Sequence, residues 1–153
     1  MTGKPRRVAQ PIPDGYHSVT AYLTVPGVAR LMDFLKQAFG AVEIDRMQDP
    51  SGRVGHAQMK IGDTMVMIGE PQGPHQQPKP CNLYLYVENV DAVYQQAIQA
   101  GGKSISEPKD QFYGDRSGGV EDPSGNGWWI ATHIEDVSQE EIARRAQALH
   151  GQH

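Results

Sequence analysis

Hydrophobic and polar residues alternate between residues 18 and 25, in the segment SVTAYLTV. Val19, Ala21, Leu23 and Val25 fall on one side of an extended chain, and Thr20, Tyr22 and Thr24 fall on the other. A period of two residues is typical of a strand with one face on a core. The aliphatic side should therefore be buried, and the Thr and Tyr side should be open.

The period then changes to that of a helix. Hydrophobic residues recur every three or four positions from Val28 to Phe39, and Gly40 is suited to end a helix. Three short strands are predicted next, at residues 42–47, 53–61 and 64–68, with turns at Asp49-Pro50-Ser51-Gly52 and Gly62-Asp63. The first half thus predicts a β-α-β-β-β unit.

The second half repeats this order after a loop rich in Pro and Gln. It predicts a strand at 81–88, a helix at 90–100, a strand at 103–107 and a hairpin within 112–133. A constant offset of 62 residues places Tyr84 on Tyr22 and Gly102 on Gly40, which indicates an internal repeat.

The predicted fold class is therefore α+β, with two tandem βαβββ modules. The expected divisions are an irregular arm at 1–15, module one at 16–70, a linker at 71–80, module two at 81–137, and a C-terminal helix and tail at 138–153. Ser138-x-x-Glu141 has the form of a capping box at the start of that helix.

The hairpin FYGDRSGGVEDPSGNGWWIATH contains both tryptophans. Gly118 and Gly119 indicate a bulge or a group close to the backbone. Trp128 and Trp129 are neighbours, so one indole should enter the core and the other should face a cavity or a partner. Alternation alone leaves open which one does so.

Composition excludes several classes of partner. The chain has 153 residues and a formal net charge of −4, so no basic field for nucleic acid or an anionic membrane is expected. No stretch approaches the roughly 20 apolar residues of a membrane span. The single cysteine, Cys81, predicts neither a disulfide nor a C-x-x-C site, and a cytoplasmic protein is expected.

The chain resembles the vicinal oxygen chelate superfamily, which includes glyoxalase I, bleomycin-resistance proteins and extradiol dioxygenases, and it is most similar to the PhnB-like branch. The resemblance lies in PDGYHSVTAYLTV, FLKQAFGA, DPSGRVGHAQMKIGD and YGDRSGGVEDPSGNGWWIATHIEDVSQEE. It implies sheets curled into half-barrels, helices on the convex side and a ligand cleft on the concave side. It also implies a homodimer, in which clefts are sometimes shared.

The resemblance further implies four metal-ligand positions, which fall here on Thr20, Met67 or its neighbour, Asn82 and Trp129. None of these is a His or a carboxylate, so no metal and no other cofactor are expected. A relocated divalent site formed by His56, Glu121, His133 and Glu70 is left open.

Alternation predicts that Thr20, Tyr22, His56, Gln58, Asn82, Tyr84 and Tyr86 face a ligand. The resemblance adds Met67 and Trp129, and Arg116 in YGDRSGG is a further candidate. Such a lining suits a flat or hydrophobic organic molecule held between rings. Arg116 could bind a ligand carboxylate or phosphate, or could instead pair with Asp115 or Glu121.

Two functions remain at this point. The favoured one is a metal-free protein of the bleomycin-resistance or PhnB-like type that binds an aromatic or amphipathic small molecule. The alternative is a lyase or isomerase acting on a carbonyl compound, with His56 or His133 as the base and with or without a relocated metal.

Overall fold

The structure is a computed structural model that describes residues 9–151. Residues 1–8 of the predicted arm and residues 152–153 of the predicted tail lie outside the described part. The first module contains β1 (Ala21–Thr24), α1 (Val28–Phe39), β2 (Val42–Gln48), β3 (Val54–Ile61) and β4 (Thr64–Gly69). Its strands form one sheet in the order β1-β4-β3-β2, with β1 parallel to β4 and the other pairs antiparallel.

The second module repeats this arrangement. It contains β5 (Asn82–Tyr86), α2 (Val90–Gln99), β6 (Lys103–Asp110), β7 (Asp115–Glu121) and β8 (Gly127–His133), followed by α3 (Gln139–His150). The sheet order is β5-β8-β7-β6, again with one parallel pair. The α+β class, the two βαβββ modules and the C-terminal helix are thus confirmed.

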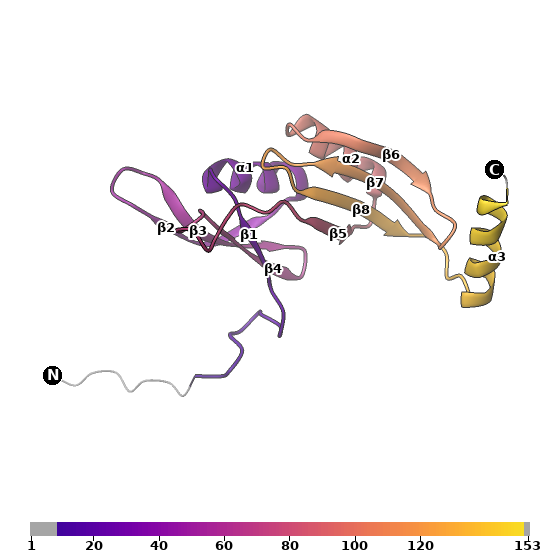
Figure 1. Cartoon of the computed structure of the whole chain (residues 1–153), viewed down its shortest axis with the longest axis horizontal. Coiled ribbons are helices and arrows are strands. Elements are labelled where there is room, and N and C mark those ends of the chain that lie inside the picture. Colours follow the sequence, from indigo (N-terminus) through magenta and orange to yellow (C-terminus); the bar gives the residue numbers. More distant parts are fainter. Residues whose placement is uncertain (1–8, 152–153) are drawn as a thin grey trace.

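The two sheets lie next to each other, and α1 and α2 lie together on one side of them (Figure 1). Leu31, Met32 and Leu35 of α1 are fully buried in the core that the helices form with the sheets. Trp128 joins the modules, because its ring lies 4.9 Å from that of Phe39 at the end of α1. Within residues 9–151, no helix covers the other side of either sheet, and we call this side the open face.

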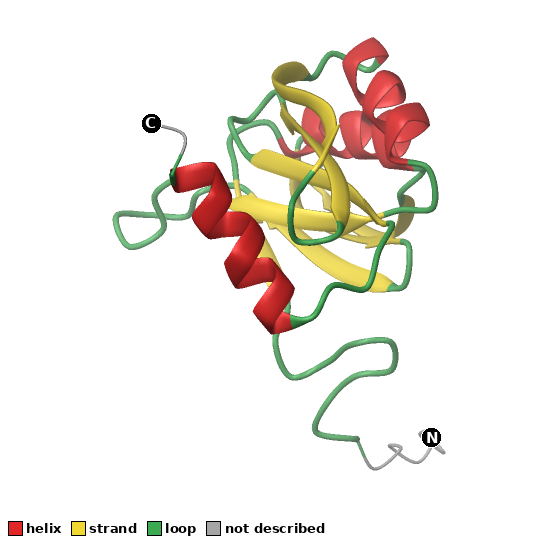
Figure 2. Ribbon diagram, turned by 90° about the vertical axis from the view of Figure 1, so that its right-hand side faces the viewer, coloured by secondary structure: helices red, strands yellow, loops and turns green. Residues whose placement is uncertain are grey.

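Helix α3 lies beyond the end of the second sheet (Figure 1) and apart from the α1–α2 pair (Figure 2). The side chain of Ser138 accepts a bond from the backbone N–H of Glu141 at 3.2 Å, so the predicted cap at its start is present. Arg145 attaches the helix by donating to the backbone carbonyl of Phe112 at 3.1 Å and by pairing with Glu135 at 2.8 Å. Ion pairs therefore hold α3, since none of its residues is buried.

The structure corrects the expected burial of one residue and the expected end of one strand. Val19 was expected on the buried face, but its side chain is 88% exposed, because β1 begins only at Ala21. The strand expected to end at Glu107 continues to Asp110. Pro108 cannot donate a ladder bond, and the pairing of β6 with β7 is irregular between Ser106 and Lys109, which accommodates it.

Buried hydrogen bonds organise the turn between β7 and β8. The carboxylate of Asp122 is 4% exposed and accepts bonds from the backbone N–H groups of Ser124 and Asn126, the side-chain amide of Asn126 and the indole N–H of Trp128. Asp122 thus caps its own turn. The bond to Trp128 also fixes that indole in the core.

No helix in the stretch from residue 9 to residue 151 is long and apolar enough to cross a membrane.

Candidate ligand-binding site

The strand register brings aromatic residues together on the open face of the second sheet. Tyr84 of β5 lies beside Trp129 of β8, which lies beside Gly119 of β7. In the next row on this face, Tyr86 lies beside Ala131, which lies beside Ser117. The two tyrosine rings are 5.2 Å apart at their centroids and are 46% and 60% exposed.

Trp129, and not Trp128, faces away from the core. Its indole lies over Gly119, where an added Cβ would come within 2.8 Å of the ring. A side chain at this position would therefore displace the indole, which explains the glycine. A Cβ added at Gly118 would lie 2.9 Å from the backbone nitrogen of Pro108, so the close approach expected at both glycines is present.

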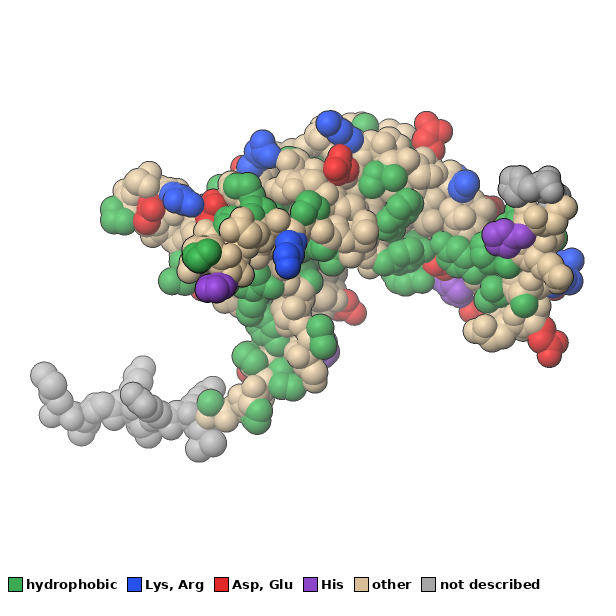
Figure 3. Space-filling model, in the orientation of Figure 1, with side chains coloured by type: hydrophobic (Ala, Val, Ile, Leu, Met, Phe, Trp, Pro, Cys, Tyr) green, Lys and Arg blue, Asp and Glu red, His purple; other side chains and the backbone are tan. Residues whose placement is uncertain are grey.

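A cavity of about 520 Å³ opens on this face. Its lining residues are Tyr84, Ser106, Lys109, Gln111, Tyr113, Ser117 and Trp129. Hydrophobic side chains gather on the surface in the region of β8 and toward α3 (Figure 3). The cavity is large enough for a small organic molecule between aromatic rings.

A buried carboxylate underlies the tyrosines. Asp115 is 3% exposed, and one of its oxygens, Oδ2, accepts bonds from the hydroxyls of Tyr84 at 2.8 Å and Tyr86 at 2.9 Å. Its other oxygen, Oδ1, lies 2.8 Å from Nδ1 of His133, whose Nε2 lies 2.7 Å from Oδ1 of Asp136. We call these five residues the Asp115 network.

The hydrogen bonds of the network determine its charges. Burial alone would raise the pKa of Asp115, but the bonds from His133, Tyr84 and Tyr86 together lower it, so the carboxylate stays ionised. Burial and the neighbouring Tyr113 and Asp115 raise the pKa of Tyr84, and the bond to Asp115 is the main reason that the pKa of Tyr86 is raised. Both phenols are therefore neutral donors.

His133 is placed between two carboxylates, which can only accept hydrogen bonds when ionised. Both ring nitrogens must then carry hydrogens, as they do in the protonated imidazolium. The bonds to Asp115 and Asp136 accordingly raise the pKa of His133 above its ordinary value of 6.5.

This arrangement predicts a pH dependence. Because the pKa of His133 is higher in the folded chain than its ordinary value of 6.5, protonation of His133 stabilises the fold. This stabilisation is complete below pH 6.5 and is lost as the pH rises through the folded pKa of His133. In His133→Gln, the decline in unfolding free energy over that interval should be smaller. NMR titration of the His133 ring should give a midpoint above 6.5, and a midpoint at or below this value would contradict the proposed bonds.

Tyr22, His56, Gln58 and Met67 of the first module lie on the open face of the first sheet, as a separate group, whereas Thr20 precedes the first ladder pair. Met67 pairs with Tyr22 and Gln58 across the ladder, and the rings of Tyr22 and His56 are 5.7 Å apart. The hydroxyl of Tyr16, from the segment before β1, donates to the side-chain oxygen of Gln58. Gln58 is therefore already hydrogen-bonded within the protein. The first-module group and the Tyr84–Trp129 row lie in different sheets.

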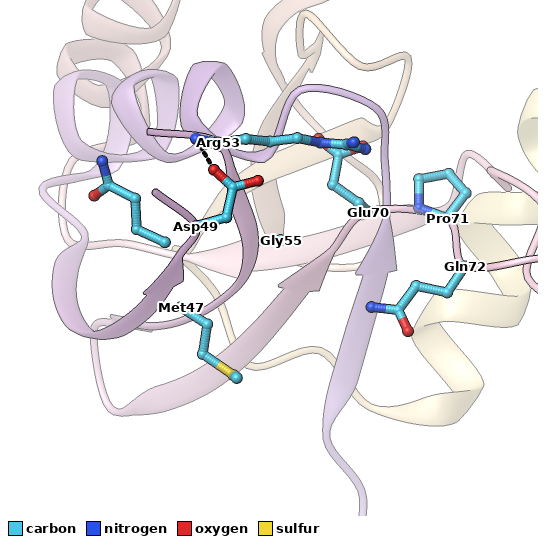
Figure 4. A pocket seen from close by; sticks show the side chains of 8 residues that line it. Met47, Asp49, Arg53, Gly55, Glu70, Pro71 and Gln72 are labelled. Carbon is cyan, nitrogen blue, oxygen red and sulfur yellow. Dashed lines mark hydrogen bonds and ion pairs between the residues drawn. The ribbon is translucent and has the colours of Figure 1, made fainter. Parts of the chain in front are cut away.

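The first module has its own cavity of about 430 Å³, bordered by Met47, Arg53, Glu70 and their neighbours (Figure 4). Glu70 is 8% exposed and accepts a bond from the backbone N–H of Gly27 at 2.9 Å, at the start of α1. Its other oxygen pairs with Arg53 at 3.3 Å. Gly27 has no side chain that could cap the helix, so Glu70, the residue after β4, does so. Its carboxylate is thus occupied by a structural role.

Arg116 faces the helices instead of the cavity. It follows Asp115 in β7, so its side chain lies on the opposite face of the sheet. The guanidinium forms two bonds of 2.9 Å to Asp91 of α2 and one of 3.1 Å to Asp110. The structure therefore does not group Arg116 with the other candidates, and its partners are neither Asp115 nor Glu121.

The residues present do not fit the metal site that the fold implies. Thr20, Met67, Asn82 and Trp129 offer no imidazole or carboxylate. The relocated set does not converge either, because Glu70 caps α1, His56 lies beside Tyr22 and His133 is bonded to Asp115. Among residues 9–151, no three His, Cys, Asp or Glu side chains are placed to hold an ion.

Residues 15–130 match the model of the Glyoxalase/Bleomycin resistance protein/Dioxygenase superfamily. The chain belongs to this family. The uncharacterized protein Mb0911c of Mycobacterium bovis is 34% identical over 135 residues, which cover 82% of this chain and 89% of that protein. The uncharacterized protein Rv0887c of Mycobacterium tuberculosis is also 34% identical, over 82% of this chain and 79% of its own length.

Solved structures show the same fold. TioX from Micromonospora sp. ML1 has a TM-score of 0.67 at 23% identity, over 75% of this chain and 97% of TioX. A PhnB protein from Bacillus cereus, described as a putative 3-demethylubiquinone-9 3-methyltransferase, has a TM-score of 0.62 at 19% identity, over 76% and 99%. At these identities, the likeness extends to the fold alone.

Proposed function

We propose that the chain is a small-molecule-binding member of this superfamily, and that its ligand is an aromatic or amphipathic organic compound. The observation that carries the proposal is the row of Tyr84 and Trp129 over Gly119, which borders a cavity of about 520 Å³. A flat ring system would stack on these side chains, which are already held in place.

The surroundings of the rings support a binding role. The Tyr84 and Tyr86 hydroxyls are fixed by Asp115, so little side-chain entropy is lost when a ligand stacks on them. Trp129 is similarly confined by its contact with the backbone at Gly119. The site is thus organised before the ligand arrives.

The state of His133 favours binding over base catalysis. A general base needs a free nitrogen lone pair within reach of the substrate proton. Both nitrogens of His133 are bonded to carboxylates, and these bonds stabilise the protonated form, which has no lone pair to offer. We therefore do not assign His133 as a base.

We also propose that the chain forms a homodimer that covers the open faces. Exposed apolar side chains on these faces support this proposal, including Met47 at 66% and Tyr86 at 60%. Each sheet supplies only one wall of a cleft within a single chain, and a second copy would supply the opposite wall. Sedimentation of the protein as a monomer at micromolar concentration would contradict the dimer.

Intrinsic fluorescence tests the binding proposal. Titration of the protein with flat two-ring compounds, such as naphthalene and quinoline derivatives, should quench emission saturably for at least one of them. The response should come from Trp129, because Trp128 is 3% exposed in the core. Trp129→Phe should therefore lose most of the quenching. Equal quenching in that variant, or no saturable quenching by any compound, would refute the proposal.

A further inference from the structure

The Asp115 network leaves the tyrosines able only to accept further strong hydrogen bonds. A phenol carries one O–H hydrogen, and both Tyr84 and Tyr86 give theirs to the same oxygen of Asp115. What remains on the two hydroxyls is lone pairs. These oxygens would therefore favour a ligand that brings hydrogens or positive charge.

The same network places a negative charge beneath the rings. Asp115 is buried and ionised, so its field is screened less than that of a surface carboxylate. His133 compensates for part of the charge of Asp115, but the His133 ring is bonded to both Asp115 and Asp136. Asp136 is fully exposed, so water screens its charge, and Asp115 is the fixed carboxylate that contacts the tyrosines.

The aromatic rings also attract positive charge. Tyr84 and Tyr86 are tilted by 56° to each other, and Trp129 lies next to Tyr84 in the sheet. The face of an aromatic ring carries the negative part of its quadrupole and attracts a cation placed over it. Several ring faces with a fixed carboxylate behind them form a surface that suits positive charge.

We propose that the ligand of this cavity is an organic cation, an aromatic or amphipathic amine or quaternary ammonium compound. The charged nitrogen lies against Tyr84 and Trp129, on the side of Tyr84 where the Tyr86 ring lies 5.2 Å away, and the apolar part fills the cavity toward Ser106 and Tyr113. This inference rests on the proposed binding function and adds the charge class of the ligand.

Lys109 is the opposing charge on the cavity lining. It is exposed on β6, at the end of a long flexible stem, so its ammonium can turn into solvent. Asp115 cannot move in this way, because three side chains hold it. The fixed charge should therefore decide the preference, and Lys109 should only reduce it.

A pair of ligands that differ in charge alone tests the proposal. Phenyltrimethylammonium and tert-butylbenzene have the same shape and number of heavy atoms, but only the first is charged. We expect the cation to bind about tenfold more tightly, on the basis of cation–π attraction and the Asp115 charge. NMR titration with the backbone amide of Gly119 as the reporter measures both affinities, and benzoate serves as the anionic comparison.

Three variants of the chain sharpen this test. Asp115→Asn keeps the shape and removes the charge, so it should weaken binding of the cation about tenfold and leave tert-butylbenzene unchanged. Lys109→Gln should strengthen binding of the cation about threefold. Asp33→Asn changes the net charge by the same amount on the exposed side of α1, and should alter neither affinity. Unchanged binding of tert-butylbenzene shows that Asp115→Asn has folded.

The possible outcomes separate the two proposals. Preferential binding of the cation, with the expected variant effects, supports the charge class. Equal or tighter binding of tert-butylbenzene or benzoate overturns it, while leaving a binding function in place. If none of the three compounds shifts the NMR signal of the Gly119 amide, the cation proposal fails. The fluorescence titration then decides independently whether the site binds larger rings.

Discussion

Asp122→Ala should lower the free energy of unfolding by about 3–4 kcal/mol, because it leaves several buried donors without an acceptor. The carboxylate is 4% exposed and accepts four hydrogen bonds, including one from the indole of Trp128. Urea denaturation followed by circular dichroism measures the loss. The core contact between Trp128 and Phe39 should loosen in the same variant.

The chain provides a matched control for this substitution. Asp49 begins an identical Asp-Pro-Ser-Gly turn between β2 and β3, and its carboxylate accepts bonds from Ser51 and from the backbone of Arg53. This turn is exposed, so water can replace the lost acceptor, and Asp49→Ala should cost about 1 kcal/mol or less. Equal losses at the two turns would show that burial of Asp122 is not the cause.

Trp129→Ala should weaken ligand binding about 30- to 100-fold, since it removes the largest ring of the cavity. The indole is only partly buried and makes no contribution to the core, so the stability of the fold should change little. Titration of the variant with any compound that binds the unmodified protein measures the loss. Trp129→Phe retains a ring and should give an intermediate affinity.

Leu149→Ala is a suitable control for this experiment. Leu149 is an apolar side chain on α3 that is 51% exposed, and it does not line the cavity. Its removal should leave the affinity unchanged. If Trp129→Ala has no more effect than Leu149→Ala, the ligand does not stack on Trp129.

Alternation predicted much of the fold and of the open faces. It placed Leu23 and Val25 on the buried side, and each is 2% exposed. The same rule placed Tyr84 and Tyr86 on the face away from the helices. The rule works here because side chains in a regular strand point to opposite faces in turn, and β1 and β5 pair regularly with their neighbours.

The rule fails where the strand itself is absent. Val19 fits the alternating pattern but lies before the first ladder pair, which is Ala21 with Val66. For Arg116, in contrast, alternation along β7 gives the right answer, which differs from the predicted place in the cavity. Its neighbour Asp115 shares a face with Ser117 and Gly119, so Arg116 must point to the helices, where it binds Asp91.

Asp115 is the residue that sequence reasoning missed. A lone aspartate at the start of a strand resembles an ordinary turn residue, and its partners Tyr84 and Tyr86 are 31 and 29 residues away in the chain. Their contact depends on the pairing of β5, β8 and β7, which no local pattern specifies. The available signal was that Asp115, Ser117 and Gly119 alternate on the same face as the predicted cleft residues.

The central claim is that a ligand binds on the open face of the second sheet, and the two indole N–H signals in a ¹H–¹⁵N NMR spectrum test it most directly. Trp129 lines the cavity, whereas the N–H of Trp128 is bonded to buried Asp122 at 2.9 Å. Addition of a ligand should shift the Trp129 signal saturably and leave the Trp128 signal in place. A Trp129 signal that stays unchanged while the ligand binds would contradict the claim.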